Sequence, residues 1–333
     1  MKAMVFDQPE RMRLEERDRS EPGAGEVIVR VAACGVCGTD LHVIRGRFPA
    51  DFPVVAGHEY AGEVVAVGEA VASLEIGQRV AIDPNIQCGV CEPCRAGKVN
   101  LCRNLTALGI HRDGGFQQFC SVPERQAYSF PDSLSFEQAA MVEPVACCLR
   151  GIEQARIRMG DRVALIGAGW IGLIMLQLVR LSGASRVVVS EPIEAKRALA
   201  ADLGADEVVD PGRDDLLALA QGTDVVIECV GSAETMSQAV SLAGDGTRVL
   251  FFGVAPPDCE IAVRPFDVYR REIEIIGSFT NPYTHQPALR LLAGGRLDVA
   301  RLISHRFPLE RLPEAIEVAE SGEAIKTLIL PNP

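Results

Sequence analysis

Two short segments carry a cysteine, a histidine and carboxylates that could share one metal ion. The first runs Cys37-Gly-Thr-Asp-Leu-His42, and the second is Gly57-His-Glu59. Zinc binds such ligands tetrahedrally, and a site with three protein ligands leaves the fourth position for water or substrate. Ligands this far apart must be brought together by a folded domain, so the pattern predicts a catalytic rather than a structural metal. The alternative is a small buried cysteine and an ordinary Gly-His-Glu turn.

A second ligand set consists of four closely spaced cysteines, Cys88, Cys91, Cys94 and Cys102. Four thiolates fill every tetrahedral position, so the ion has no opening for substrate. The spacing predicts a structural zinc that fastens a surface lobe without a core of its own. An iron–sulfur cluster is the alternative occupant, although the last gap matches neither common ferredoxin spacing.

A glycine motif, Gly167-Ala-Gly169-Trp170-Ile171-Gly172, lies between a predicted strand at 162–166 and an apolar helix at 173–181. In this context the glycines permit a tight turn and let backbone N–H groups approach a pyrophosphate at the helix N-terminus. The next predicted strand, 186–190, ends at Glu191. That carboxylate can accept hydrogen bonds from both adenosine ribose hydroxyls and would repel a 2′-phosphate, which favours NAD over NADP.

The elements around these motifs indicate two kinds of domain. Predicted strands at 2–6, 26–33, 62–68 and 78–82, separated by glycine turns, favour a compact β-barrel. Helices and strands alternate later in the chain. The expected helices are 195–203, 216–220 and 235–242, and the expected strands are 207–209, 225–228, 248–252 and 272–276. This alternation predicts a doubly wound parallel sheet.

Length and charge narrow the class of partner. The 333 residues, 48% hydrophobic and 23% charged, suit two soluble domains. A formal charge of −12 without a basic stripe argues against nucleic acid and anionic membrane, and favours a small-molecule substrate. No signal or transit pattern precedes the first predicted strand, so we expect a cytoplasmic protein. The uncharged stretch 163–179 reads as strand, turn and helix rather than as a membrane span.

Three further residues have two interpretations each. Glu143, in Met141-Val-Glu-Pro144 before a helical stretch at 145–154, is either a salt-bridge partner at a helix start or a third carboxylate for the metal. His111 and His285 either line the pocket or are solvated loop histidines.

Over nearly its whole length the chain resembles the zinc-containing medium-chain alcohol dehydrogenases, in particular the polyol (sorbitol), threonine and butanediol dehydrogenase branch. The resemblance rests on the motifs at Cys37 and Gly57, the four-cysteine lobe, Glu143-Pro144 and the glycine motif. It implies a GroES-like catalytic domain over residues 1–145 and 281–333, with two zinc sites. A Rossmann NAD-binding domain would occupy residues 146–280. It also implies a homodimer or homotetramer.

The resemblance further implies a role for each matching residue. Cys37 and His58 would hold the catalytic zinc, with Glu59 and Glu143 as carboxylates, one ligating and the other reaching zinc directly or through water. Asp40 would orient His58. Thr39 would take the substrate hydroxyl proton and pass it through the nicotinamide ribose to His42. Cofactor contacts would fall on Gly167, Gly169, Trp170, Ile171, Gly172, Glu191, Lys196, Gly253, Val254, Ser278 and Phe279.

The expected activity is transfer of a hydride from a secondary hydroxyl of a polyol or sugar alcohol to NAD, giving a ketose. Zinc would lower the pKa of the bound hydroxyl, as it lowers that of water to about 7. Val43 and Thr280 stand where sorbitol dehydrogenases place a tyrosine and an arginine, which favours a generic polyol or secondary alcohol over sorbitol. The alternatives are a threonine 3-dehydrogenase, a butanediol dehydrogenase, or an inactive NAD-binding regulator on the same fold.

Overall fold

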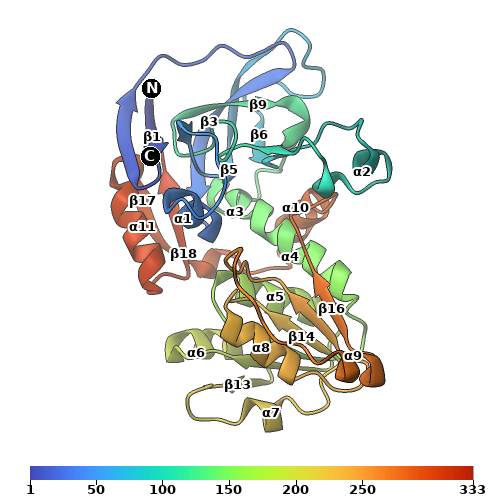
Figure 1. Cartoon of the computed structure of the whole chain (residues 1–333). Helices are drawn as coiled ribbons and strands as arrows, with labels where there is room; N and C mark the ends of the chain where they lie inside the picture. Colours follow the sequence, from blue (N-terminus) through green and yellow to red (C-terminus); the bar gives the residue numbers. More distant parts are fainter. Residues whose placement is uncertain (333) are drawn as a thin grey trace. The chain divides into compact units, whose positions relative to one another are not determined.

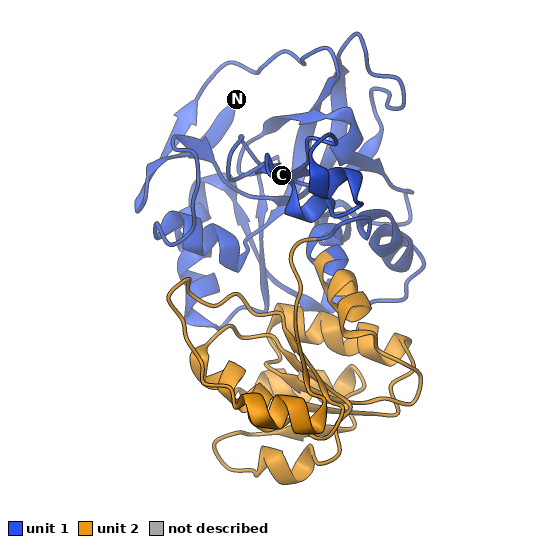
Figure 2. Ribbon diagram, turned by 45° about the vertical axis from the view of Figure 1, so that its right-hand side comes forward, with its two compact units in different colours: residues 1–146, 281–333 blue, residues 147–280 orange. Residues whose placement is uncertain are grey.

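The computed structural model describes residues 1–332, which form two compact units (Figure 2). Unit 1 comprises residues 1–146 together with the chain from residue 281 onward, and unit 2 comprises residues 147–280. The chain leaves unit 1 within helix α4 (Val142–Ala155) and re-enters it after the last strand of unit 2. Unit 1 is therefore assembled from both ends of the sequence.

Unit 1 is built mainly from strands (Figure 1). They are β1 (Lys2–Gln8), β2 (Arg11–Glu16), β3 (Glu26–Gly35), β4 (Val54–Val55), β5 (Glu59–Val67), β6 (Arg79–Ile82), β7 (Asn85–Ile86), β8 (Thr106–Ala107), β9 (Phe119–Pro123), β10 (Ala127–Ser129), β17 (Ile303–Pro308) and β18 (Lys326–Leu330). Within residues 1–332 the largest sheet has the order β10-β6-β5-β3-β18-β17, with β9 also paired to β3. Smaller sheets join β2-β1-β4 and β7-β8.

Short helices connect and cover these strands. They are α1 (Gly38–Ile44), α2 (Glu92–Arg95), η1 (Val99–Leu101), η2 (Glu124–Gln126), α3 (Phe136–Ala140), α10 (His285–Ala293), η3 (Ala300–Leu302), η4 (Leu309–Arg311) and α11 (Leu312–Ser321). A single hydrophobic core includes Phe6, Tyr60 and Phe116 from the first part of the chain, and Leu312 and Ile329 from its end. Burial of these side chains ties the C-terminal segment to the barrel.

Unit 2 is a parallel sheet in the order β13-β12-β11-β14-β15-β16, within the described part of the chain. Its strands are β11 (Arg162–Ile166), β12 (Arg186–Ser190), β13 (Glu207–Val209), β14 (Val225–Glu228), β15 (Arg248–Phe251) and β16 (Glu274–Gly277). Its helices are α5 (Trp170–Leu181), α6 (Glu194–Asp202), α7 (Leu216–Leu219), α8 (Ala233–Ser241) and α9 (Pro265–Arg271). In chain order the strands read 3-2-1-4-5-6, the doubly wound arrangement with its switch point beside β11.

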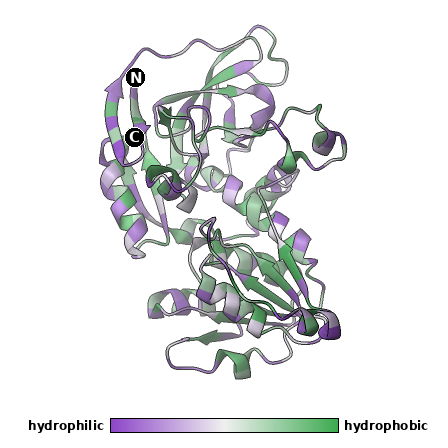
Figure 3. Cartoon of the chain, in the orientation of Figure 1, coloured by the Kyte–Doolittle hydropathy of each residue, from purple (hydrophilic) through white to green (hydrophobic). Residues whose placement is uncertain are grey.

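Hydrophobic strands fill the centre of unit 2, as Figure 3 shows. Strands of a parallel sheet are covered on both faces and therefore read as continuous apolar runs, which is what β11, β12 and β14 contain. The predicted barrel and doubly wound sheet are thus confirmed. Among residues 1–332 no helix combines the length and apolarity that a membrane span requires.

Candidate active site and zinc centres

Strand pairing brings the first set of ligands together. Cys37 lies two residues after the end of β3 and is the N-cap of α1, while β5 begins at Glu59, directly after His58. Because β3 and β5 are antiparallel, with Gly35 opposite Glu59, the end of one strand meets the start of the other. One ligand atom from each of Cys37, His58 and Glu59 lies within 4.8 Å of the others. This set of sulfur, nitrogen and oxygen donors suits zinc with an open fourth position.

Asp40 fixes the orientation of His58. Its Oδ1 lies 3.1 Å from His58 Nδ1, and the backbone N–H groups of Cys37 and Gly57 donate to its carboxylate at 2.9 and 3.2 Å. An ionised carboxylate can only accept, so Nδ1 carries the proton and Nε2 is left for a metal. Burial lowers the pKa of His58, but Asp40 and Cys37 outweigh burial and raise that pKa well above its usual value in the metal-free chain.

Lys326 contacts this group, although the sequence motifs did not reveal it. It opens β18 and is 4% exposed, its Nζ forms an ion pair with Glu59 Oε2, and it donates to Val36 O at 3.0 Å. Burial lowers the pKa of Lys326, but the negative charges of Glu59, Cys37 and Asp40 raise it above its usual value overall. A lysine at the start of a short, mostly apolar strand was the available signal.

The remaining predicted proton-transfer and ligand residues lie on nearby elements. Thr39 and His42 are half-buried and three residues apart on α1, so they share one face of that helix. Glu143 is buried in the first turn of α4. The structure does not place Glu143 in the group formed by Cys37, His58 and Glu59. Its role as a metal carboxylate therefore stays a prediction.

The four-cysteine lobe has the geometry of a tetrahedral thiolate site. One sulfur from each of Cys88, Cys91, Cys94 and Cys102 lies within 4.8 Å of the others. Zinc–sulfur bonds of about 2.3 Å imply tetrahedral edges of about 3.8 Å, and the Sγ atoms of Cys91 and Cys102 are 3.8 Å apart.

Backbone groups also favour the thiolate forms of Cys88 and Cys91. The N–H groups of Val90 and Cys91 lower the pKa of Cys88 to about 6. The N–H groups of Cys88 and Asn104 each lie 3.3 Å from Cys102 Sγ. Two short elements carry three of the ligands: Cys91 is the N-cap of α2, Cys94 lies within α2, and Cys102 is the C-cap of η1. Such short elements fit an ion that replaces a core.

The predicted cofactor contacts gather at one edge of the parallel sheet. The glycine motif follows β11, Glu191 follows β12, Gly253 and Val254 follow β15, and Ser278 and Phe279 follow β16. Carboxyl ends of parallel strands share one edge, where doubly wound folds bind dinucleotides. Gly169 is the N-cap of α5, and a Cβ on Gly172 would lie 1.9 Å from Gly167 O. Glycine is therefore required at position 172 by close packing.

Glu191 holds the glycine motif from the neighbouring strand. Its Oε2 accepts from Ala168 N at 2.8 Å and its Oε1 accepts from Ile193 N at 3.0 Å, while the side chain is 6% exposed. In α6, Arg197 donates to Glu191 O at 2.7 Å and pairs with Asp210 at 3.2 Å. Lys196, also on α6, is half-buried. The carboxylate thus lies beside the predicted pyrophosphate loop.

Glu228 is a second buried carboxylate at this edge, and the sequence patterns did not single it out. It ends β14, and its Oε1 accepts from Val230 N, Gly231 N and Thr235 Oγ1 at 2.7 to 2.8 Å. A Cβ on Gly253 would lie 2.7 Å from its Oε2. Glu228 therefore shapes the loop after β14, and the backbone N of Gly231 in that loop, 2.2 Å from the same Cβ, requires glycine at position 253.

Of the two histidines with open interpretations, His285 is buried in a helix, whereas His111 is a half-buried turn residue. His285 begins α10 and is 1% exposed, and its ring is tilted by 41° against that of Tyr128, with the ring centroids 4.6 Å apart. Burial lowers the pKa of His285 to about 3. His111 Nδ1 accepts from Ala107 N at 3.0 Å. Val43 is 1% exposed inside unit 1. The solvated-loop interpretation is therefore wrong for His285.

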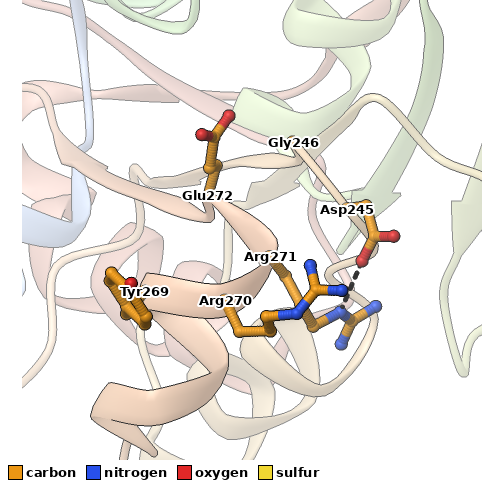
Figure 4. A pocket seen from close by; sticks show the side chains of 6 residues that line it. All are labelled: Asp245, Gly246, Tyr269, Arg270, Arg271 and Glu272. Atoms are coloured by element: carbon orange, nitrogen blue, oxygen red, sulfur yellow. Dashed lines mark hydrogen bonds and ion pairs between the residues drawn. The ribbon is translucent and has the colours of Figure 1, made fainter.

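A cavity of about 440 Å³ lies at the opposite edge of the parallel sheet (Figure 4). It is lined by Asp245, Gly246, Tyr269, Arg270, Arg271 and Glu272, and Arg271 Nε donates to Asp245 at 2.9 Å across its rim. These residues precede β15 and β16 rather than follow them. Dinucleotides bind at carboxyl ends of strands, so this cavity is not the cofactor site.

Comparison with known proteins agrees with both halves of this description. The family profile for the alcohol dehydrogenase GroES-like domain matches residues 23–132, and that for the zinc-binding dehydrogenase matches residues 171–294. The chain is 37% identical over 319 residues to D-altritol 5-dehydrogenase of Agrobacterium fabrum, with 94% of each protein covered.

Two solved structures extend the comparison to cofactors. A zinc-binding dehydrogenase from Sinorhizobium meliloti 1021 bound to NADP has a TM-score of 0.96 and 42% identity, with 99% of each chain covered. The rspB alcohol dehydrogenase from Escherichia coli CFT073, complexed with NADH, has a TM-score of 0.92 and 30% identity, again over 99% of each chain. The chain belongs to the zinc-containing medium-chain alcohol dehydrogenases, within the polyol dehydrogenase branch.

Proposed function

We propose that this zinc polyol dehydrogenase transfers a hydride from a secondary hydroxyl of a polyol or sugar alcohol to NAD, giving a ketose. The observation that carries the proposal is the group of Cys37, His58 and Glu59, in which Asp40 leaves His58 Nε2 free for a metal. The similarity to an altritol dehydrogenase supports a polyol substrate.

The residues of unit 1 suit alcohol oxidation. A zinc held by Cys37, His58 and Glu59 would supply Lewis acidity that lowers the pKa of a substrate hydroxyl. Thr39 would accept the hydroxyl proton, and His42, on the same face of α1, would release it to solvent. Asp40 would keep the imidazole ring of His58 in one orientation throughout turnover.

Glu191 supports NAD as the cofactor. Its carboxylate is buried beside the glycine motif, where the 2′-phosphate of NADP would meet a like charge. The guanidinium of Arg197 is already engaged by Asp210 and by Glu191 O. Because the relative from S. meliloti was solved bound to NADP, use of NADP by this chain must be tested directly. We expect kcat/KM with NAD to exceed that with NADP by at least about a hundredfold.

The substrate proposal favours vicinal diols and polyols of roughly four to six carbons over primary alcohols, because a second hydroxyl could also contact the metal or a carboxylate. We expect no phosphorylated substrate, since the net charge of −12 would repel one. Sorbitol is not singled out, because Val43 and Thr280 replace a tyrosine and an arginine.

The test is NADH formation by zinc-replete protein with a panel of polyols, secondary alcohols, ethanol, L-threonine and sugar phosphates. We expect turnover with polyols or secondary alcohols, its loss in Cys37→Ser, and wild-type rates in Cys259→Ser, a matched change at a cysteine in neither ligand set. Higher activity with ethanol than with every polyol and secondary alcohol tested would contradict the substrate class. Oxidation of only threonine, or of only a sugar phosphate, would also contradict it. NAD binding without any turnover would favour the inactive regulator.

Assembly and location are also proposed. A homodimer or homotetramer should appear in sedimentation equilibrium, and fractionated cells should hold the protein in the cytoplasm. A monomer or a membrane-bound pool would contradict these two expectations.

A further inference from the structure

Lys326 connects the two segments that supply the predicted zinc ligands. Its Nζ donates to Val36 O, directly before Cys37, and pairs with the carboxylate of Glu59, directly after His58. Strand β18 brings it there by pairing with β3, where Leu328 lies opposite Gly35. The side chains of Lys326 and Glu59 are 4% and 1% exposed, so water does not screen this pair.

The ammonium group of Lys326 and a zinc ion would compete for the carboxylate of Glu59. A carboxylate oxygen that faces a buried ammonium gives up part of its negative charge to that contact, and the same positive charge repels a divalent cation nearby. Both effects weaken the attraction between Glu59 and a zinc ion held by Cys37 and His58. A side chain that served packing alone would have neither effect.

We propose that Lys326 is a positioning residue that sets the strength of Glu59 as a zinc ligand. Lys326 holds the carboxylate of Glu59 in place when the metal is absent. When the metal is present, Lys326 limits how strongly that carboxylate binds the zinc ion. The inference rests on the proposed zinc site at Cys37, His58 and Glu59. It does not depend on the substrate or on the choice of cofactor.

The proposal predicts the sign of an effect on metal binding. In Lys326→Met the ammonium is gone and zinc becomes the cation nearest to Glu59, so the catalytic zinc should be held more tightly. We expect its release to a colorimetric chelator to slow by about tenfold or more. Lys326→Arg keeps the charge and should release zinc as the wild type does. Lys2→Met removes a lysine from the exposed ion pair with Glu310 and is the matched control.

The experiment uses full-length, zinc-loaded protein and follows release of each ion over time. Cys37→Ser, which lacks the catalytic ion, identifies the kinetic phase that belongs to it. Cobalt placed in the catalytic site gives a second reading, because its visible absorption bands depend on ligand strength; they should shift in Lys326→Met and not in Lys326→Arg. In a Glu59→Gln background, Lys326→Met should lose most of its effect.

Faster or unchanged zinc release in folded Lys326→Met, or unshifted cobalt bands, would overturn the proposal. Lys326→Gln, which can still donate to Val36 O without a charge, is expected to act like Lys326→Met and serves if the methionine variant does not fold. If neither folds, Lys326 is a structural residue and the proposal is wrong. Each readout is independent of turnover, so failure of polyol oxidation would leave these outcomes fully interpretable.

Discussion

Replacing Gly35 with alanine should displace Glu59 from the ligand group. Gly35 ends β3 opposite Glu59, and a Cβ added there would lie 2.1 Å from Glu59 Oε2, 2.9 Å from Lys326 Cε and 3.0 Å from Met141 Cε. Gly35 is not among the residues with positive φ, so alanine strains the backbone little. The perturbation is therefore a steric push on one carboxylate.

The size of the effect follows from these separations. Moving Oε2 out to 3.0 Å, the shortest separation that Cβ atoms normally show, needs roughly 1 Å of displacement. A misplacement of about 1 Å at a reacting centre can lower the rate by about a hundredfold. Overpacking of a buried site should lower the free energy of unfolding by about 1–3 kcal/mol. We therefore expect Gly35→Ala to fold, to bind the catalytic zinc weakly and to turn over about a hundredfold more slowly.

The assay combines zinc content by elemental analysis with kcat/KM for the best polyol found. Gly25→Ala is the matched control, because Gly25 lies just before the same strand and a Cβ there would meet nothing within 4 Å. The reasoning is refuted if folded Gly35→Ala keeps both zinc ions and a kcat/KM within about threefold of the wild type.

Three further predictions concern the metals, the cofactor and pH. Cys37→Ser should lose one zinc ion and all turnover without unfolding. Cys91→Ser should lose the other zinc ion and melt at a lower temperature. Finding one zinc ion or none in wild-type protein purified without chelator would contradict this prediction. Glu191→Ala should reduce the NAD-to-NADP ratio of kcat/KM by about tenfold or more, and an unchanged ratio would contradict the role of Glu191. Burial raises the pKa of Asp83 from 3.8 to about 6, so ionisation of Asp83 destabilises the fold as pH rises through that range. Asp83→Asn should therefore stabilise the protein by roughly 3 kcal/mol at pH 8 and by little below about pH 4. Denaturant unfolding of both proteins at both pH values measures this difference. An equal gain in the free energy of unfolding at the two pH values would contradict the prediction.

Local sequence patterns predicted most of the fold. The strand, glycine motif and helix at residues 162–181 are contiguous, so hydrophobic periodicity and turn chemistry reveal them directly. The four cysteines are equally local, and their sulfurs indeed lie together. The gathering of Cys37, His58 and Glu59 depended on the family resemblance as well as on the residue types.

What the sequence did not reveal depends on contacts between distant segments. The ion pair of Lys326 with Glu59 exists only because β18 pairs with β3, almost a whole chain length away. Helix α9 was also missed, since it is one short run whose main signal is Pro265 at its first position. His285 read as a loop residue because the apolar face of α10 becomes evident only once its packing partners are known.

The central claim is that hydride passes from a secondary carbinol carbon to NAD. It is tested most directly with a polyol or secondary alcohol carrying deuterium at that carbon, with the reduced cofactor examined by mass spectrometry and NMR after a single turnover. We predict one deuterium in the nicotinamide ring for each ketone formed, and no transfer in Cys37→Ser. Deuterium found in solvent water, or a reduced cofactor without deuterium, would contradict direct hydride transfer by this protein.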